Sequence, residues 1–144
     1  DRSKGEVHMK SDKLNRIKVE PKLDNIEMVT QYIEDGFRQL GVSMKIITKF
    51  NIALDEIFSN IVYYGEADMV EAGYGIEQGK AVLVLKDNGK QYNPLEKEEP
   101  DITLNADDRP IGGLGICIFK KLMDDMTYTR QDGQNILVIK KTID

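Results

Sequence analysis

The chain has 144 residues, of which 40% are hydrophobic, and a formal net charge of -5. This length suits one well-packed domain and is too short to expect two. The acidic balance opposes binding to a nucleic-acid backbone, and no apolar segment approaches the ~20 residues that span a bilayer. We therefore expect a cytoplasmic protein without nucleic-acid or membrane partners. Residues 1–12 are expected to form a flexible tail, partly vector-derived, and residues 13–144 the domain.

The chain is expected to begin with a short strand and a helix. Apolar and polar residues alternate over 16–20, which is typical of a half-buried strand. Apolar residues then recur at helical spacing over 23–40, and Gly41 is a suitable C-terminal stop. Asp24 and Glu27 resemble a capping box, which predicts the start of this helix.

A second helix and an antiparallel pair of strands are expected next. An apolar face predicts a helix of about 22 residues from Ser43 to Gly65. Alternation over 70–77 and the apolar run 80–86 predict two strands, with a turn at 78–79.

The C-terminal third is expected to hold a long loop, a helix and a hairpin. Residues 87–110 contain three prolines and little apolar periodicity, which indicates a loop. A glycine-rich segment then leads into a third helix, and a hairpin turns near Asp132 and Gly133. This order predicts an α+β two-layer sandwich with helices on one face of a mostly antiparallel mixed sheet.

The first motif with chemical potential lies on the second predicted helix, in "LDEIFSNIVYY". Glu56 and Asn60 are four residues apart and therefore about 40° apart around the helix axis. A carboxylate can accept a hydroxyl proton, and an amide oxygen is a hard ligand for magnesium, so the pair suits phosphoryl transfer. The alternative is an ordinary solvated helix margin, because this spacing is common.

The second motif is "DNGKQYNP", which follows the buried strand. Asp87 at the strand end can accept a hydrogen bond from a ligand amino group, and Gly89 lets a planar ring approach the backbone. Alternatively these residues only make a turn, which they favour in any protein.

The third motif is "RPIGGLGI", at a junction between loop and helix. Gly112, Gly113 and Gly115 allow backbone amides to converge on phosphate, aided by the helix N-terminus. The spacing matches neither G-x-G-x-x-G nor a P-loop, so a simple flexible start to the helix is the alternative.

The order and spacing of the three motifs resemble the N box, G1 box and G2 box of the gyrase, histidine-kinase and MutL ATPase superfamily, which has the Bergerat fold. The resemblance spans about residues 14–141. Within that superfamily, "ALDEIFSNIVYYGE" and the compact "GGLGI" look most like the bacterial anti-sigma factor serine/threonine kinases.

The resemblance implies a role for each motif in binding ATP and Mg²⁺. Asp87 matches the residue that accepts the adenine amino group, with Gly89 leaving room for the base. Asn60 matches the magnesium ligand that bridges the phosphates, and Glu56 matches the general base. The loop Gly112, Gly113, Leu114 and Gly115 matches the phosphate-contacting segment. Residues 92–111 match the ATP lid, from which Arg109 is expected to reach a phosphate.

The function implied by the resemblance is that of an ATP-dependent protein serine/threonine kinase. Such a kinase sequesters a sigma factor and phosphorylates a serine on an anti-anti-sigma antagonist, and it acts as a homodimer. Two alternatives stay open: the catalytic domain of a sensor histidine kinase, and a non-catalytic switch that only binds ATP.

Overall fold

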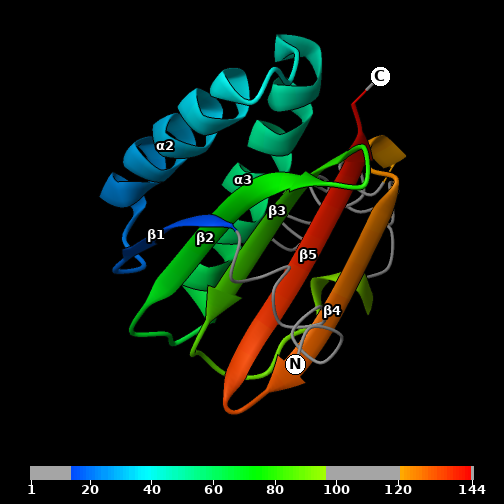
Figure 1. Ribbon diagram of the computed structural model, residues 1–144. Coiled ribbons are helices and arrows are strands. Elements are labelled where there is room, and N and C mark those ends of the chain that lie inside the picture. Colours follow the sequence, from blue (N-terminus) through cyan, green and yellow to red (C-terminus); the bar gives the residue numbers. More distant parts are fainter. Residues whose placement is uncertain (1–13, 97–120, 144) are drawn as a thin grey trace, which may run out of the picture.

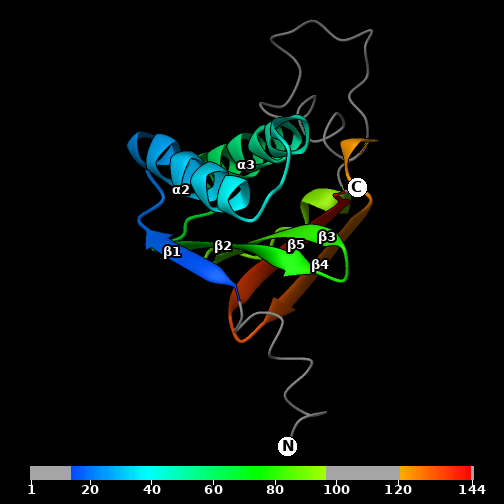
Figure 2. The ribbon, with the colours of Figure 1, turned by 45° about the horizontal axis from the view of Figure 1, so that its top comes forward.

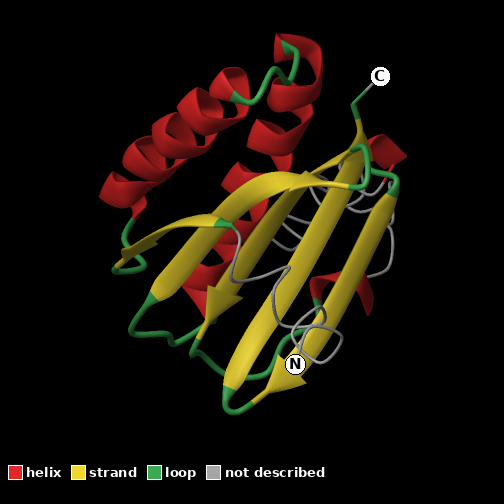
Figure 3. Cartoon of the chain, viewed as in Figure 1, coloured by secondary structure: helices red, strands yellow, loops and turns green. Residues whose placement is uncertain are grey.

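The computed structural model describes residues 14–96 and 121–143. Five strands, two α-helices and two short 3-10 helices follow one another along the described chain (Figures 1 and 3). In chain order they are β1 (Asn15–Val19), η1 (Leu23–Asn25), α2 (Ile26–Gln39), α3 (Met44–Tyr64), β2 (Val70–Glu77), β3 (Lys80–Asp87), η2 (Pro94–Glu96), β4 (Asp125–Gln131) and β5 (Gln134–Thr142).

The strands form one sheet in the order β1-β2-β3-β5-β4, and α2 and α3 both pack on the same face of it (Figure 2). Each neighbouring pair of described strands is antiparallel. The predicted α+β sandwich is therefore confirmed, with antiparallel pairing throughout the described part of a sheet that was expected to be mixed. Because β3 lies in the middle of the sheet, its last residue, Asp87, is placed at a buried edge of the core.

Helix α3 begins and ends where the sequence predicts. The Ser43 hydroxyl accepts a hydrogen bond of 3.4 Å from the backbone N–H of Ile46, and Gly65 follows the last helical residue. One face of the helix is buried in the core by a row of large apolar side chains that includes Ile47, Phe50, Leu54 and Phe58. This burial fixes the rotation of the helix about its axis, and with it the direction of its polar margin.

The predicted capping box at the start of α2 is wrong. Asp24 lies inside the 3-10 turn η1, and Asn25 occupies the N-cap position without a side-chain bond to the helix. The Asn25 amide instead donates to the backbone carbonyl of Glu20 at 2.9 Å. The extra 3-10 turn moves the helix start past Asp24, so Asp24 and Glu27 cannot bond reciprocally across the first turn.

Aromatic rings fill the space between α2 and the sheet. The ring of Tyr74 on β2 lies with its centroid 5.5 Å from that of Phe37, in an edge-to-face arrangement. The ring fits only because residue 36 is glycine: a Cβ there would lie 1.9 Å from Cζ of Tyr74. Helix α2 therefore packs more closely on β2 than any side chain at this position would permit.

Both hairpins turn on residues with positive φ. Gln78 and Gly79 have φ of 51° and 79°, and Asp132 and Gly133 have φ of 53° and 77°, as expected of two-residue turns that match the twist of the strands. The predicted hairpins are confirmed.

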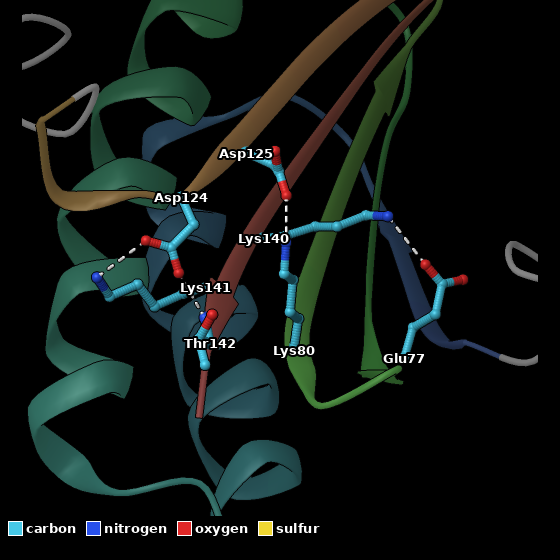
Figure 4. Close-up of polar contacts among 7 residues, drawn as sticks. All are labelled: Glu77, Lys80, Asp124, Asp125, Lys140, Lys141 and Thr142. Carbon is cyan, nitrogen blue, oxygen red and sulfur yellow. Dashed lines mark hydrogen bonds and ion pairs between the residues drawn. The ribbon is translucent and has the colours of Figure 1, made fainter. Parts of the chain in front are cut away.

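Charged side chains link β2, β3, β4 and β5 near one end of the sheet (Figure 4). Lys80 donates to Asp125 at 2.6 Å, and Lys140 donates to Glu77 at 2.9 Å. The carboxylate of Asp124 accepts from the backbone N–H of Thr142 at 2.7 Å, and this bond lowers the pKa of Asp124. These contacts fix the start of β4 against the end of β5.

The third predicted helix lies mostly outside the described residues. Lys121 and Leu122 are helical, and Met123 and Asp124 connect them to β4. Within residues 14–96 and 121–143, no helix is long and apolar enough to cross a membrane.

Candidate functional site

A pocket opens between α3 and the ends of β3 and β5 that lie near residue 87. Its empty volume is about 550 Å³, part of it open to solvent. Apolar side chains make most of its wall: Ile57, Ile61, Leu85, Pro94 and Leu137. Such a wall suits a flat heterocycle better than a charged group.

The buried polar side chains of the described residues all line this pocket. They are Asn60, Asp87 and Asn135, with exposed fractions of 5%, 7% and 7%. Burying a polar group without compensation costs stability, so natural cores avoid it where nothing is gained. The concentration of all three at one pocket marks it as the candidate binding site.

The turn that follows Asp87 is fastened to the end of α3. The backbone N–H of Lys90 donates to the carbonyl of Gly65 at 2.8 Å. The side-chain oxygen of Asn88 accepts from the backbone N–H groups of Asp68 and Met69 at 2.8 and 3.1 Å. The turn is therefore held on one side by the connection between α3 and β2.

Gly89 is required by the same contact. A Cβ at this position would lie 2.2 Å from the carbonyl oxygen of Gly65, far inside any normal contact. Packing of backbone against backbone thus explains this glycine in the structure. The role expected from the sequence, leaving room for a base, is a separate requirement and stays a prediction.

One carboxylate oxygen of Asp87 accepts two hydrogen bonds from within the protein. Its Oδ1 accepts from the backbone N–H of Gly89 at 2.9 Å and from Nδ2 of Asn135 at 3.1 Å. Its Oδ2 has no donor among the described residues. Because the side chain is almost fully buried yet lines the pocket, it offers a charged acceptor of fixed orientation to a ligand.

Helix α3 contributes the second pair of predicted residues. Glu56 and Asn60 are joined by a hydrogen bond of 3.3 Å from Nδ2 of Asn60 to Oε2 of Glu56. Asn60 lines the pocket and is buried, whereas Glu56, one turn earlier on the helix, is partly exposed. The helix thus carries an amide into the pocket and a carboxylate to its margin, as the spacing predicts.

Two tyrosines also line the pocket. Tyr64 and Tyr92 are 42% and 38% exposed. Burial raises the pKa of Tyr92, and the negative charge of Glu56 raises it further. Tyr92 therefore stays a neutral phenol at physiological pH.

Sequence reasoning missed three side chains behind Asp87. Asn135 begins the buried part of β5, and Tyr128 and Arg130 on β4 donate to its side-chain oxygen at 2.5 and 3.2 Å. The available signal was Asn135 itself, a polar residue directly before the apolar run "ILVI". Its register opposite Asp87 was not recognised from the hairpin pattern.

The remaining predicted site residues fall outside the described part of the chain. They are Arg109 of the expected lid and the expected phosphate loop, Gly112, Gly113, Leu114 and Gly115. Their roles stay predictions. Glu56, Asn60, Asp87 and Gly89 are described, and the structure brings them together around or beside one pocket.

Comparison with known families identifies the fold. Residues 19–141 match the family described as the histidine kinase-like ATPase domain. The chain belongs to this family. As a histidine kinase-like ATPase domain it is expected to bind ATP, and the superfamily resemblance based on the three motifs is confirmed.

Among curated relatives of this ATPase domain are serine-protein kinases RsbW of Bacillus thuringiensis and Bacillus cereus. Each is 24% identical over 131 residues, which covers 86% of this chain and 82% of the relative. The printed name, serine-protein kinase, agrees with the resemblance of the motifs to a family of serine/threonine kinases.

Solved structures of low sequence identity share the fold. The RsbU and RsbW domains of Rv1364c from Mycobacterium tuberculosis match with a TM-score of 0.62 at 12% identity, covering 90% of this chain and 32% of that one. A blue-light activated histidine kinase from Erythrobacter litoralis matches with a TM-score of 0.52 at 13% identity, covering 71% and 32%. The matched part covers about a third of either protein.

The described residues fit an adenine nucleotide. The apolar wall accepts a base, and the buried Asp87 carboxylate provides the acceptor that an exocyclic amino group needs. Within residues 14–96 and 121–143, no three His, Cys, Asp or Glu side chains gather to hold a metal ion. Asn60, which lines the pocket, carries an amide oxygen that would suit a magnesium ion as a ligand.

Proposed function

We propose that the chain binds ATP with Mg²⁺ in this pocket and transfers the γ-phosphoryl group to a serine of a partner protein. The observation that carries the proposal is the burial of Asp87, Asn60 and Asn135 around one apolar pocket, with Glu56 at its margin. Family membership and the RsbW relatives support it.

Asp87 recognises the base in this proposal. Its Oδ2 accepts a hydrogen bond from the adenine amino group, while Oδ1 remains bound to Gly89 and Asn135. The apolar wall covers the faces of the base, and Tyr64 and Tyr92 add aromatic rings to the lining.

In this proposal Asn60 and Glu56 act on the phosphate groups of ATP and on the serine that receives the γ-phosphoryl group. Asn60 offers its side-chain oxygen to Mg²⁺, since its nitrogen donates to Glu56. The carboxylate of Glu56 takes the proton of the substrate serine as the serine oxygen bonds to the γ-phosphorus and ADP leaves. Magnesium supplies charge neutralisation on the phosphates, and Arg109 with the loop 112–115 is proposed to contact them.

The proposed partners are those implied by the resemblance to the anti-sigma factor serine/threonine kinases. We propose that the chain binds a sigma factor, that its phosphoacceptor is an anti-anti-sigma protein, and that it works as a homodimer. The name of the RsbW relatives, serine-protein kinase, supports the choice of serine as acceptor.

Two measurements test the proposal. Saturating Mg-ATP at about one hundred times its dissociation constant should stabilise the domain by about 2.7 kcal/mol, and the absence of any shift in Tm would refute nucleotide binding. Labelled ATP should transfer phosphate to a serine of a candidate antagonist. Transfer to a histidine would support the sensor-kinase alternative, and binding without any transfer would support the switch.

A further inference from the structure

Asn135 uses the whole hydrogen-bonding capacity of its side chain. Its Nδ2 donates to Oδ1 of Asp87 at 3.1 Å and to the backbone carbonyl of Lys90 at 2.8 Å. Its Oδ1 accepts from the backbone N–H of Tyr92 at 3.3 Å, from the hydroxyl of Tyr128 at 2.5 Å and from Nη1 of Arg130 at 3.2 Å. An amide with both hydrogens and its oxygen satisfied has one orientation.

The surrounding donors decide which way this amide points. A backbone N–H and a guanidinium N–H can only donate, so the atom that faces Tyr92 and Arg130 must be the oxygen. The nitrogen therefore faces Asp87 and the carbonyl of Lys90. Arg130 also donates to the carbonyl of Gly89 at 2.7 Å, which ties β4 to the same turn.

We infer that Asn135 is a positioning residue that sets the base selectivity of the pocket by holding the carboxylate of Asp87 in the orientation that accepts an amino group. The inference rests on the proposed function. Asn135 is the side-chain donor to Oδ1, so together with the backbone N–H of Gly89 it fixes the rotation of the Asp87 side chain and leaves Oδ2 for a ligand. By binding the backbone of Lys90 and Tyr92, it also fixes the chain that leaves the turn.

The test compares ATP with ITP, whose base carries an oxygen in place of the amino group. The parental chain should bind ATP about 10-fold to 100-fold more tightly than ITP, the range of one hydrogen bond to a charged group. Asn135→Asp keeps the shape and the acceptor for Tyr92, Tyr128 and Arg130 but replaces the donor to Asp87 with a negative charge. Its preference for ATP should fall to within about 3-fold of unity.

A matched control adds the same charge one residue away. Gln134 is exposed at the start of β5, so Gln134→Glu changes the net charge equally without reaching Asp87. It should keep the parental preference for ATP. Titrations of all three chains with both nucleotides, with the Tm of each as a check on folding, complete the comparison.

The outcomes separate the inference from the proposed function. A folded Asn135→Asp chain that retains the parental preference would overturn the inference alone. A parental chain that binds neither nucleotide, or both equally, would refute adenine recognition itself.

If Asn135→Asp does not fold, NMR of the parental chain decides. The Nδ2 hydrogens of Asn135 should shift on addition of ATP and much less on addition of ITP, because only ATP places a donor on the partner carboxylate. Equal shifts with the two nucleotides would overturn the inference.

Discussion

Asp87→Asn is the sharpest test of nucleotide recognition, because the structure fixes how the new amide must lie. Two donors, the backbone N–H of Gly89 and Nδ2 of Asn135, point at Oδ1 of the native carboxylate. The amide of the variant must place its own oxygen there. The opposite orientation would set its nitrogen against both donors and lose two buried bonds, each worth about 1–3 kcal/mol when a buried donor is left unsatisfied.

The amide nitrogen of the variant therefore takes the place of Oδ2 and faces the pocket. An adenine amino group would then meet a donor instead of an acceptor. The lost interaction is a hydrogen bond to a charged group, worth about 1.5–3 kcal/mol, so affinity for ATP should fall about 10-fold to 100-fold. The bonds to Gly89 and Asn135 survive, so the free energy of unfolding without nucleotide should change by less than about 1 kcal/mol.

The assay is calorimetric or fluorescence titration with Mg-ATP, with urea unfolding of the same preparation as the control for folding. A folded variant that binds ATP within 2-fold of the parental chain would refute the role of Asp87 in base recognition. A variant that unfolds readily without nucleotide would show that the orientation argument is wrong, since it predicts an intact native network.

Three further predictions address catalysis, packing and pH. The side chain of Glu56→Gln can still accept the hydrogen bond from Asn60 but cannot take a proton, so serine phosphorylation should fall about 10²-fold or more at unchanged ATP affinity. An unchanged rate of phosphate transfer would show that Glu56 is not the base. Gly36→Ala gains about 1 kcal/mol of helix propensity but forces a Cβ to 1.9 Å from Tyr74, an overpacking that costs about 1–3 kcal/mol, so urea unfolding should show a net loss of up to about 2 kcal/mol; a more stable variant would contradict the packing. The bond from Thr142 lowers the pKa of Asp124 below 3.8, so its contribution is fully present above about pH 4 and is lost as pH falls through the folded value. Asp124→Asn should therefore be less stable than the parental chain at pH 7, by under about 1 kcal/mol because the group is exposed, and the difference should shrink as the pH falls below 3.8 and through the folded pKa.

Local patterns were sufficient to predict most of the fold. The bounds of α3 follow from Ser43, Gly65 and a long apolar face, and the hairpin turns follow from the glycine at the second turn position of each, Gly79 and Gly133. The predicted start of α2 was wrong because a capping box and a 3-10 turn use the same residue types, and the bond from the Asn25 side chain to the carbonyl of Glu20 favours the turn.

The candidate site was predictable only in part. Glu56 and Asn60 lie on one helix, where spacing alone brings two side chains together. Asn135 reaches Asp87 across 48 residues of sequence through the register of β3 and β5, which depends on how a long loop and a hairpin close. Tyr128 and Arg130 depend on the same register, so they could not be assigned before the strand order was known.

The close packing of Gly89 on the carbonyl of Gly65 shows that the glycine and the aspartate of "DNG" are required for different reasons. The glycine of "DNG" is demanded by the fold, whether or not anything binds, because any Cβ there would collide with the end of α3. Asp87, two residues earlier, is required only for binding a ligand. An asparagine at this position could accept the same hydrogen bonds from Gly89 and Asn135. A homologous chain that has lost nucleotide binding is therefore expected to keep the glycine at the position of Gly89 and to carry other residues at the position of Asp87. In sorting active members of this family from inactive ones, the acid is informative and the glycine is not.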